Sequence, residues 1–141
     1  MSAAPDQDGT AVDYGLELLP QHAALLAAST ITRDVARARA YRSVTRKVDL
    51  RRAGFADSQC VVPTLLMPVY SVHGEVALYQ HRPDAPRVRE GRPLKYETPA
   101  RARMVIDVPP AARPRHADPL VPLFITEGIR KADALVSYGI S

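Results

Sequence analysis

The sequence predicts an α+β fold, with N-terminal helices, a small mixed or antiparallel sheet, and a strand–turn–helix unit at the C-terminal end. Three observations support this class. Apolar residues recur at helical spacing in residues 18–53, two β-type runs flank a His73-Gly74 turn, and an apolar run at residues 120–125 precedes a second helical stretch. A chain of 141 residues is long enough for one core, or for a core subdomain and part of a second one.

We expect four segments along the chain. Residues 1–17 include a stretch rich in Ser, Ala, Pro, Asp and Gly, and we expect them to form a disordered lead-in. Residues 18–60 are a basic helical segment, residues 61–119 a β-rich subdomain, and residues 120–141 the start of a further α/β unit. Thirteen prolines and no tryptophan favour short elements joined by stiff connections.

The helical segment carries start and stop signals. Pro20 suits the first turn of a helix, and Thr32 suits the N-cap of a second helix that runs to about residue 40. A third helix is expected over about residues 48–53, before a glycine. His22 is interpreted as an exposed or capping histidine.

The body of the chain is distinctly basic. The net charge is +4, but residues 1–18 hold four acids and no Lys or Arg, so the remainder carries nineteen basic and eleven acidic residues. Residues 32–52 alone contain eight cations, which are Arg33, Arg37, Arg39, Arg42, Arg46, Lys47, Arg51 and Arg52. Two interpretations stay open: a surface that contacts nucleic-acid phosphates, or the solvated faces of two amphipathic helices.

Several protein classes are disfavoured. No apolar run is long enough to cross a bilayer, and the first residues lack the basic and apolar regions of a signal peptide, so we expect a cytoplasmic protein with no membrane partner. Cys60 is the single cysteine and is interpreted as a small buried residue. His116 has no companions at metal-ligand spacing and is assigned no role.

Two β-type runs, residues 61–72 and 75–81, are expected to form a hairpin. Pro63 and Pro68 in the first run predict an edge strand or a bulge, because proline cannot donate a ladder hydrogen bond. Residues 104–108 are expected to form another short strand.

The end of the second run and the loop after it carry candidate binding residues. Alternation along a strand places Tyr79 with His81 on one face and Gln80 with Arg82 on the other. Tyr79 and Arg82 suit the binding of single-stranded nucleic acid through stacking and phosphate contact, with core packing of Tyr79 as an open alternative. The following polar loop contains four arginines, Arg87 among them.

Glu127 and Gly128 are expected to form the turn between the last strand and the last helix. A carboxylate at the C-terminal end of a buried strand lies where open α/β sheets bind ligands, and it can hold a divalent cation. The alternative is a turn whose carboxylate caps the helix near its N-terminus. Arg130 and Lys131 follow in the first helical turn as candidates for phosphate contact.

Three segments together resemble a known family. The stretch Ile125-Thr-Glu-Gly-Ile-Arg-Lys-Ala-Asp-Ala-Leu135, with Tyr138-Gly-Ile140 downstream, looks like the first signature of the TOPRIM fold, the metal-binding catalytic fold of bacterial primases and topoisomerases. The segment Leu94-Lys-Tyr-Glu-Thr-Pro99 resembles the lysine-tyrosine segment that precedes TOPRIM in bacterial primases. The stretch Pro68-Val-Tyr-Ser-Val-His-Gly-Glu-Val76, followed by Arg82, resembles the strand–turn–strand before that. The likeness covers about residues 60–141.

The resemblance is closest to primase-like proteins of phages, plasmids and integrated mobile elements, many of them known only as domains of unknown function. It implies that Glu127 holds Mg²⁺, that Lys95 and Arg82 meet nucleic-acid or nucleotide phosphate, and that Tyr96 packs beneath Lys95. The chain would then end in the first, incomplete βα unit of a TOPRIM-like fold.

The carboxylates needed for two-metal phosphoryl transfer are not all present. In TOPRIM proteins the others come from an Asp-x-Asp element after the next strand, and this sequence ends at Ser141. Asp133 should point away from the edge of the strand, and Asp107 belongs to another strand. We therefore expect little independent catalysis. A Mg²⁺-dependent nucleotidyltransferase would need a C-terminal half, absent here or supplied by another chain.

The first hypothesis is thus a truncated primase-like protein of mobile-element replication. It would bind single-stranded DNA or RNA, or nucleotides, and would have a C-terminal half or a helicase as a possible partner. One alternative is a non-enzymatic basic module that binds nucleic acid through its arginines. Another is the decayed reading frame of a phage-type primase, whose half-sheet lacks its neighbours.

Overall fold

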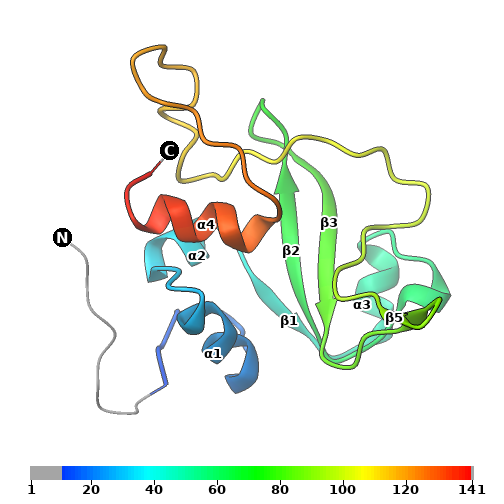
Figure 1. Ribbon diagram of the computed structural model, residues 1–141. Helices are drawn as coiled ribbons and strands as arrows, with labels where there is room; N and C mark the ends of the chain where they lie inside the picture. The colour runs from blue at the N-terminus through cyan, green and yellow to red at the C-terminus, as the bar shows by residue number, and fades with distance from the viewer. Residues whose placement is uncertain (1–10, 141) are drawn as a thin grey trace.

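A computed structural model of the chain describes residues 11–140 and has the α+β architecture that the sequence predicts (Figure 1). The expectation of a disordered lead-in lies outside the described residues for positions 1–10. The element order is α1 (Pro20–Ala28), α2 (Arg33–Arg39), β1 (Arg42–Val44), α3 (Lys47–Arg52), the 3₁₀ helix η1 (Asp57–Gln59), β2 (Thr64–Tyr70), β3 (Val76–Pro83), β4 (Val88–Arg89), β5 (Arg92–Pro93) and α4 (Ile129–Ser137).

The three-stranded sheet is antiparallel in the order β1-β2-β3. Strands β2 and β3 form the predicted hairpin, which Gly74 closes at a φ of +81°. Of the two alternatives predicted from the prolines, an edge strand or a bulge, the edge strand does not describe β2 as a whole, because β2 is central in the sheet. Proline is tolerated there because β1 pairs only with residues 64–66, and the ladder between β2 and β3 carries an irregularity just beyond Pro68, between Val69 and Tyr70.

Alternation along β2 directs its side chains into two cores on opposite faces of the sheet. Leu65, Met67 and Val69 pack in the core shared with α1, α2 and Ile129 of α4, whereas Leu66 packs with the core under α3. Figure 1 shows α1, α2 and α4 on one side of the sheet and α3 on the other. Cys60 is buried in the core under α3, as predicted.

The helix signals in the sequence are largely confirmed. Pro20 lies in the first turn of α1, and the Thr32 hydroxyl caps α2 by accepting from the backbone N–H of Val35 at 3.5 Å. The interpretation of His22 as exposed is wrong, since it is 2% exposed and hydrogen-bonded on both ring nitrogens. Disorder does not extend to Tyr14, whose buried hydroxyl donates to the carbonyl of Ile31 at 2.9 Å.

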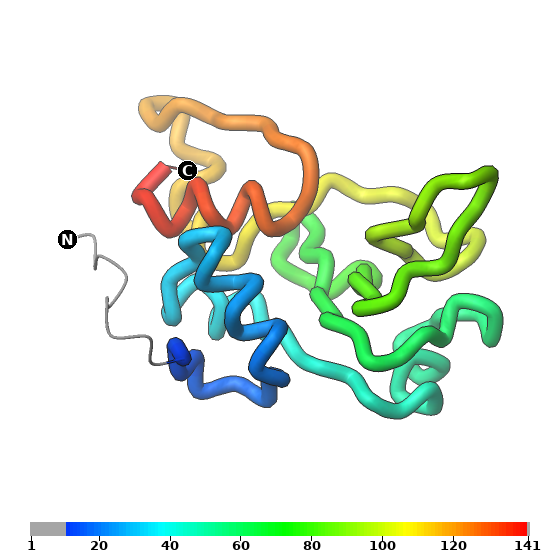
Figure 2. The backbone as a smooth tube through the Cα atoms, turned by 60° about the horizontal axis from the view of Figure 1, so that its bottom comes forward, coloured from blue at the N-terminus to red at the C-terminus, as the bar shows by residue number. Residues whose placement is uncertain are grey.

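The two strands predicted at residues 104–108 and 120–125 are not formed. Both stretches have β-type side chains, but among residues 11–140 neither forms a ladder with a neighbouring strand: residues 104–108 make one backbone hydrogen bond to β2, from the N–H of Val108 to the carbonyl of Tyr70 at 3.0 Å. Figure 2 shows the run from residue 100 to 128 leaving the sheet, making a loop and returning to the start of α4. Of the expected βα unit, only the helix α4 is formed. The large apolar residues of the expected strand, such as Leu123 and Ile125, are exposed.

Candidate phosphate-binding pocket

A pocket of about 450 Å³ opens between β3, the segment after β5 and the start of α4. Its lining residues are Gln80, Arg82, Lys95, Tyr96, Glu127, Gly128, Ile129, Arg130 and Lys131. We call it the basic pocket. It brings together five of the seven residues that the sequence singled out for metal or phosphate binding.

Strand β3 supplies the floor of the basic pocket. Its alternation turns His81 into the protein interior and leaves Gln80 and Arg82 on the opposite face, as predicted. His81 pairs with Glu97 through two backbone hydrogen bonds of 2.9 and 3.0 Å. This pairing fixes the preceding residues, Lys95 and Tyr96, beside the strand.

The side chain of Glu97 is held by hydrogen bonds from two neighbouring side chains. Arg87 donates to both of its carboxylate oxygens, with 3.1 Å between Nε and Oε2, and Gln59 Nε2 lies 3.4 Å from Oε1. Burial alone raises the pKa of Glu97, but the hydrogen bonds from Arg87 and Gln59 outweigh it and hold the pKa below its usual 4.5. Arg87 does not line the basic pocket, and its charge is balanced by that of Glu97.

Gly128 sets the direction of α4. Its φ of +85° and ψ of 148° suit glycine, and the helix begins at the next residue, Ile129, which is buried in the core. Within the described residues, Glu127 accepts no hydrogen bond from the first turn of α4, and its position before the helix leaves a favourable interaction with the helix dipole as the form in which the capping alternative stays open. Its carboxylate lies 3.8 Å from Lys131 Nζ, and its side chain is 96% exposed.

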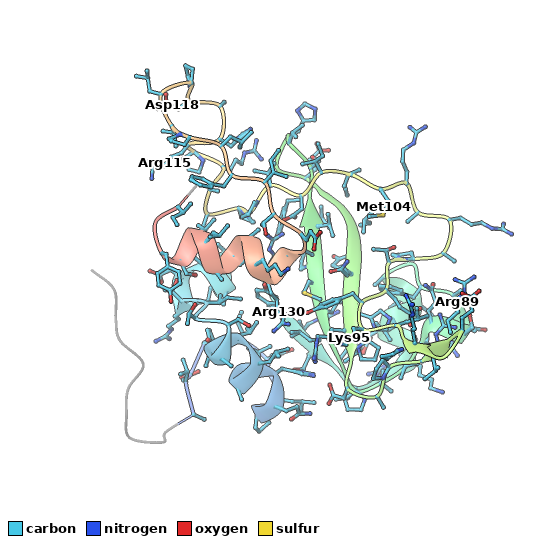
Figure 3. All side chains as sticks on the ribbon, viewed as in Figure 1. Arg89, Lys95, Met104, Arg115, Asp118 and Arg130 are labelled. Atoms are coloured by element: carbon cyan, nitrogen blue, oxygen red, sulfur yellow. The ribbon has the colours of Figure 1, made fainter. Side chains whose placement is uncertain are left out.

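Arg130 connects α4 to two other parts of the molecule through hydrogen bonds. Its Nε donates to the Tyr96 hydroxyl at 2.8 Å, and its Nη1 donates to Ser29 Oγ at 2.9 Å. The guanidinium carbon lies 5.8 Å from the centre of the Tyr96 ring. The aromatic ring that was expected to support Lys95 is thus engaged by Arg130. Figure 3 shows Arg130 and Lys95 on the same side of the molecule.

The pocket is electropositive. Four cationic side chains line it against the one carboxylate of Glu127. Arg82 and Lys95 have no ion pair within residues 11–140, and Arg82 Nε is buried without a hydrogen-bond partner in the same part of the chain. Unpaired donors of this kind favour an anion with several acceptor oxygens.

Tyr79 and the helical arginines lie outside the pocket. Tyr79 packs against the core under α3, so the geometry favours core packing over stacking. Of the eight cations of residues 32–52, Arg39 is buried and the other seven are exposed. The exposed members fit either interpretation of this basic stretch.

The pocket does not by itself offer a magnesium centre. In the part of the chain that the structure describes, no group of three or more His, Cys, Asp or Glu residues could hold a metal ion. Glu127 is a single carboxylate among cations, which is a poor donor set for Mg²⁺. Its role as a metal ligand stays a prediction.

A buried ionic cluster was missed by the sequence reasoning. Arg39, fully buried, donates to both oxygens of Asp107 at 2.6 and 2.8 Å and to both oxygens of Asp133 at 2.8 and 3.0 Å. Asp133 also accepts from the Tyr41 hydroxyl at 2.6 Å, and it faces away from the basic pocket, as expected. Burial opposes the charge on Arg39, but the two carboxylates outweigh it and raise its pKa. We call this group the Arg39 cluster.

The helical spacing of residues in α2 and α4 could have indicated part of the Arg39 cluster. Arg39 follows Val35 and Ala36 on the buried face of α2, and Asp133 follows Ile129 on the buried face of α4. Opposite charges on the apolar faces of two helices can reach low energy only as a pair. No sequence pattern, however, says which helices meet.

A second polar group joins α1 to the sheet. The ring of His22 lies 2.5 Å from Ser43 Oγ through Nδ1 and 2.7 Å from Asp84 Oδ1 through Nε2. Burial raises the pKa of Asp84, but hydrogen bonds from Gln21 and His22 outweigh it and lower the pKa. None of these residues lines the basic pocket, and we interpret the group as a structural tie.

No family model, curated protein or solved structure matches this chain. Within residues 11–140, no helix has the length and apolar character that crossing a membrane requires.

Proposed function

We propose that this protein binds single-stranded nucleic acid, or a nucleotide, through phosphate contacts in the basic pocket, as a primase-like component of mobile-element replication. The observation that carries the proposal is the convergence of Arg82, Lys95, Arg130 and Lys131 on one pocket with a single opposing carboxylate. These residues come from three separate segments of the chain, which are β3, the segment after β5 and the first turn of α4.

The pattern of resemblance supports the same proposal. The three segments that resemble primases end at Arg82, contain Lys95 and contain Glu127, and all three residues line the pocket. If the three similarities were due to chance, the matching residues would not be expected to line the same pocket. With one carboxylate, the pocket supports binding rather than phosphoryl transfer by these residues alone.

The surroundings of the cations suit a flexible strand. Tyr96 is 38% exposed beside Arg130 and offers an aromatic surface to a base, and Gln80 adds an amide with both a donor and an acceptor. Neither contact demands one particular base. Affinity would come mainly from phosphates, because each phosphate that a cation neutralises releases a counterion.

The proposal is tested by titrating a labelled oligothymidylate against the protein at several salt concentrations, with fluorescence anisotropy as the readout. If two to four phosphates are neutralised, the logarithm of the binding constant should fall with the logarithm of salt with a slope of roughly −1.5 to −3. Lys95→Gln should weaken binding and make the slope shallower by about 0.7.

Lys47→Gln is the matched control. Lys47 is exposed, has no ion pair within the described residues and does not line the pocket. Lys47→Gln therefore lowers the net charge by the same one unit as Lys95→Gln without changing the pocket. An equal loss of affinity in the two variants would reject the pocket and favour the helical basic surface. A binding constant that does not change with salt would reject phosphate recognition altogether.

A further inference from the structure

A second cavity, of about 540 Å³, shares Gly128 with the basic pocket and is mainly apolar. Its walls include Ile106 and Val108 from the unpaired run after residue 100, the segment Leu123, Phe124 and Ile125, and Leu135 of α4. We call it the apolar groove. The function proposed above does not use it.

The groove exposes far more apolar surface than isolated hydrophobic residues do. Ile125 is 90% exposed, Ile106 79%, Leu123 69% and Phe124 56%, with Val72 and Val105 at 46% and 37%. Taking ~170 Å² for a fully open side chain of this size, these residues expose on the order of 600 Å², the upper end of what monomers leave open. With the half-buried residues of α4, the surface approaches the ~800 Å² that each partner buries in a stable complex.

The backbone beside the groove is also unpaired. Between Leu123 and Glu127 no backbone N–H or C=O has a hydrogen-bond partner among the described residues. Figure 1 draws this stretch as a long run that leads to α4 with no strand beside it. An apolar run with free backbone donors and acceptors has the chemistry of an open sheet edge.

We propose that the apolar groove is a homodimer interface, in which residues 123–126 of two copies pair as antiparallel strands about a two-fold axis. A two-fold pairing presents the same patch on both chains, so each copy fills the groove of the other and both backbones gain hydrogen bonds. Residues 119–126 contain no charged side chain. The net positive charge of the protein therefore does not oppose pairing at this edge.

Analytical ultracentrifugation of the full chain over a wide concentration range tests the proposal. The expected result is a concentration-dependent shift from the 15.4 kDa of one chain to twice that mass. Ile125→Lys should abolish the shift, because it places two like charges across the axis. Since the side chain is 90% exposed, the variant should keep the circular dichroism spectrum of the parent protein, and it should keep the thermal midpoint that the parent shows at concentrations too low for dimerisation.

Leu120→Lys is the matched control. Leu120 is also 90% exposed but does not line the groove, so its variant should still dimerise. Amide hydrogen exchange at residues 123–126 should slow as protein concentration rises. A monomer at all concentrations, equal effects of the two substitutions, or particles of undefined size would each overturn the proposal. The first of these would leave the groove to a different polypeptide.

Discussion

The Arg39→Met substitution tests most directly how the fold is held together. Arg39 lies at the centre of the Arg39 cluster, where it donates to Asp107, Asp133 and the carbonyl of Pro68. Its side chain and that of Asp133 are 0% exposed, and Asp107 is 16% exposed. Removing the guanidinium would leave two carboxylates close together and without a counter-charge.

The expected loss follows from that geometry. Breaking a buried ion pair from one side costs about 3–5 kcal/mol, because the remaining charge stays desolvated. Domains of this size have about 5–15 kcal/mol of stability, so this loss would be a large share of the total. The midpoint of thermal unfolding should fall by roughly 10–20 °C.

Urea and thermal unfolding, followed by circular dichroism, measure this effect. Arg37→Met is the control, because Arg37 lies exposed on the same helix and its loss should cost less than about 0.5 kcal/mol. Asp133→Asn should cost less than Arg39→Met, since Asp107 still balances the guanidinium. A loss below about 1 kcal/mol for Arg39→Met would refute the reasoning.

Three further outcomes are expected. Glu127→Gln removes the one carboxylate of the basic pocket, so oligonucleotide affinity in Mg²⁺-free buffer should rise about 2–5-fold. If added Mg²⁺ then raises the affinity of the parent protein and of the variant equally, Glu127 is excluded as a metal ligand. Gly128→Ala should lower stability by about 1–3 kcal/mol in urea unfolding, purely through its backbone conformation; an unchanged midpoint would contradict this. Because the pKa of Glu97 is depressed in the folded state, its contact with Arg87 stabilises fully above about pH 4.5 and loses that contribution as the pH falls further. The stability difference from Glu97→Gln should shrink in that range, and parallel pH profiles would disprove it.

The parts of the fold that local chemistry determines were predictable. Proline at the first turn of α1, the Thr32 cap and the two-residue period of β2 each depend on neighbours close in sequence. The pairing of Arg82, Lys95 and Glu127 in one pocket was predictable only as far as the resemblance to primases extends. Periodicity alone gives no distance between them.

The failures arise where a partner is needed from far along the chain. Residues 104–108 and 120–125 have strand-like composition, but a strand exists only where another backbone pairs with it. Arg39 looked like one more cation of a basic helix, and its burial depends on two carboxylates 68 and 94 residues away. His22 was misjudged for the same reason, because Asp84 lies 62 residues downstream.

Gly128 contributes to the walls of both the basic pocket and the apolar groove. Its peptide units connect residues 123–126, the segment proposed to pair, to the first turn of α4. If a second copy straightens residues 123–126, the same peptide planes position the first turn of α4, where Arg130 and Lys131 are located. If this movement couples the two proposed sites, thermodynamic reciprocity requires that self-association and nucleic-acid binding alter each other by one common factor. The oligomeric state of the protein would then report whether nucleic acid is bound.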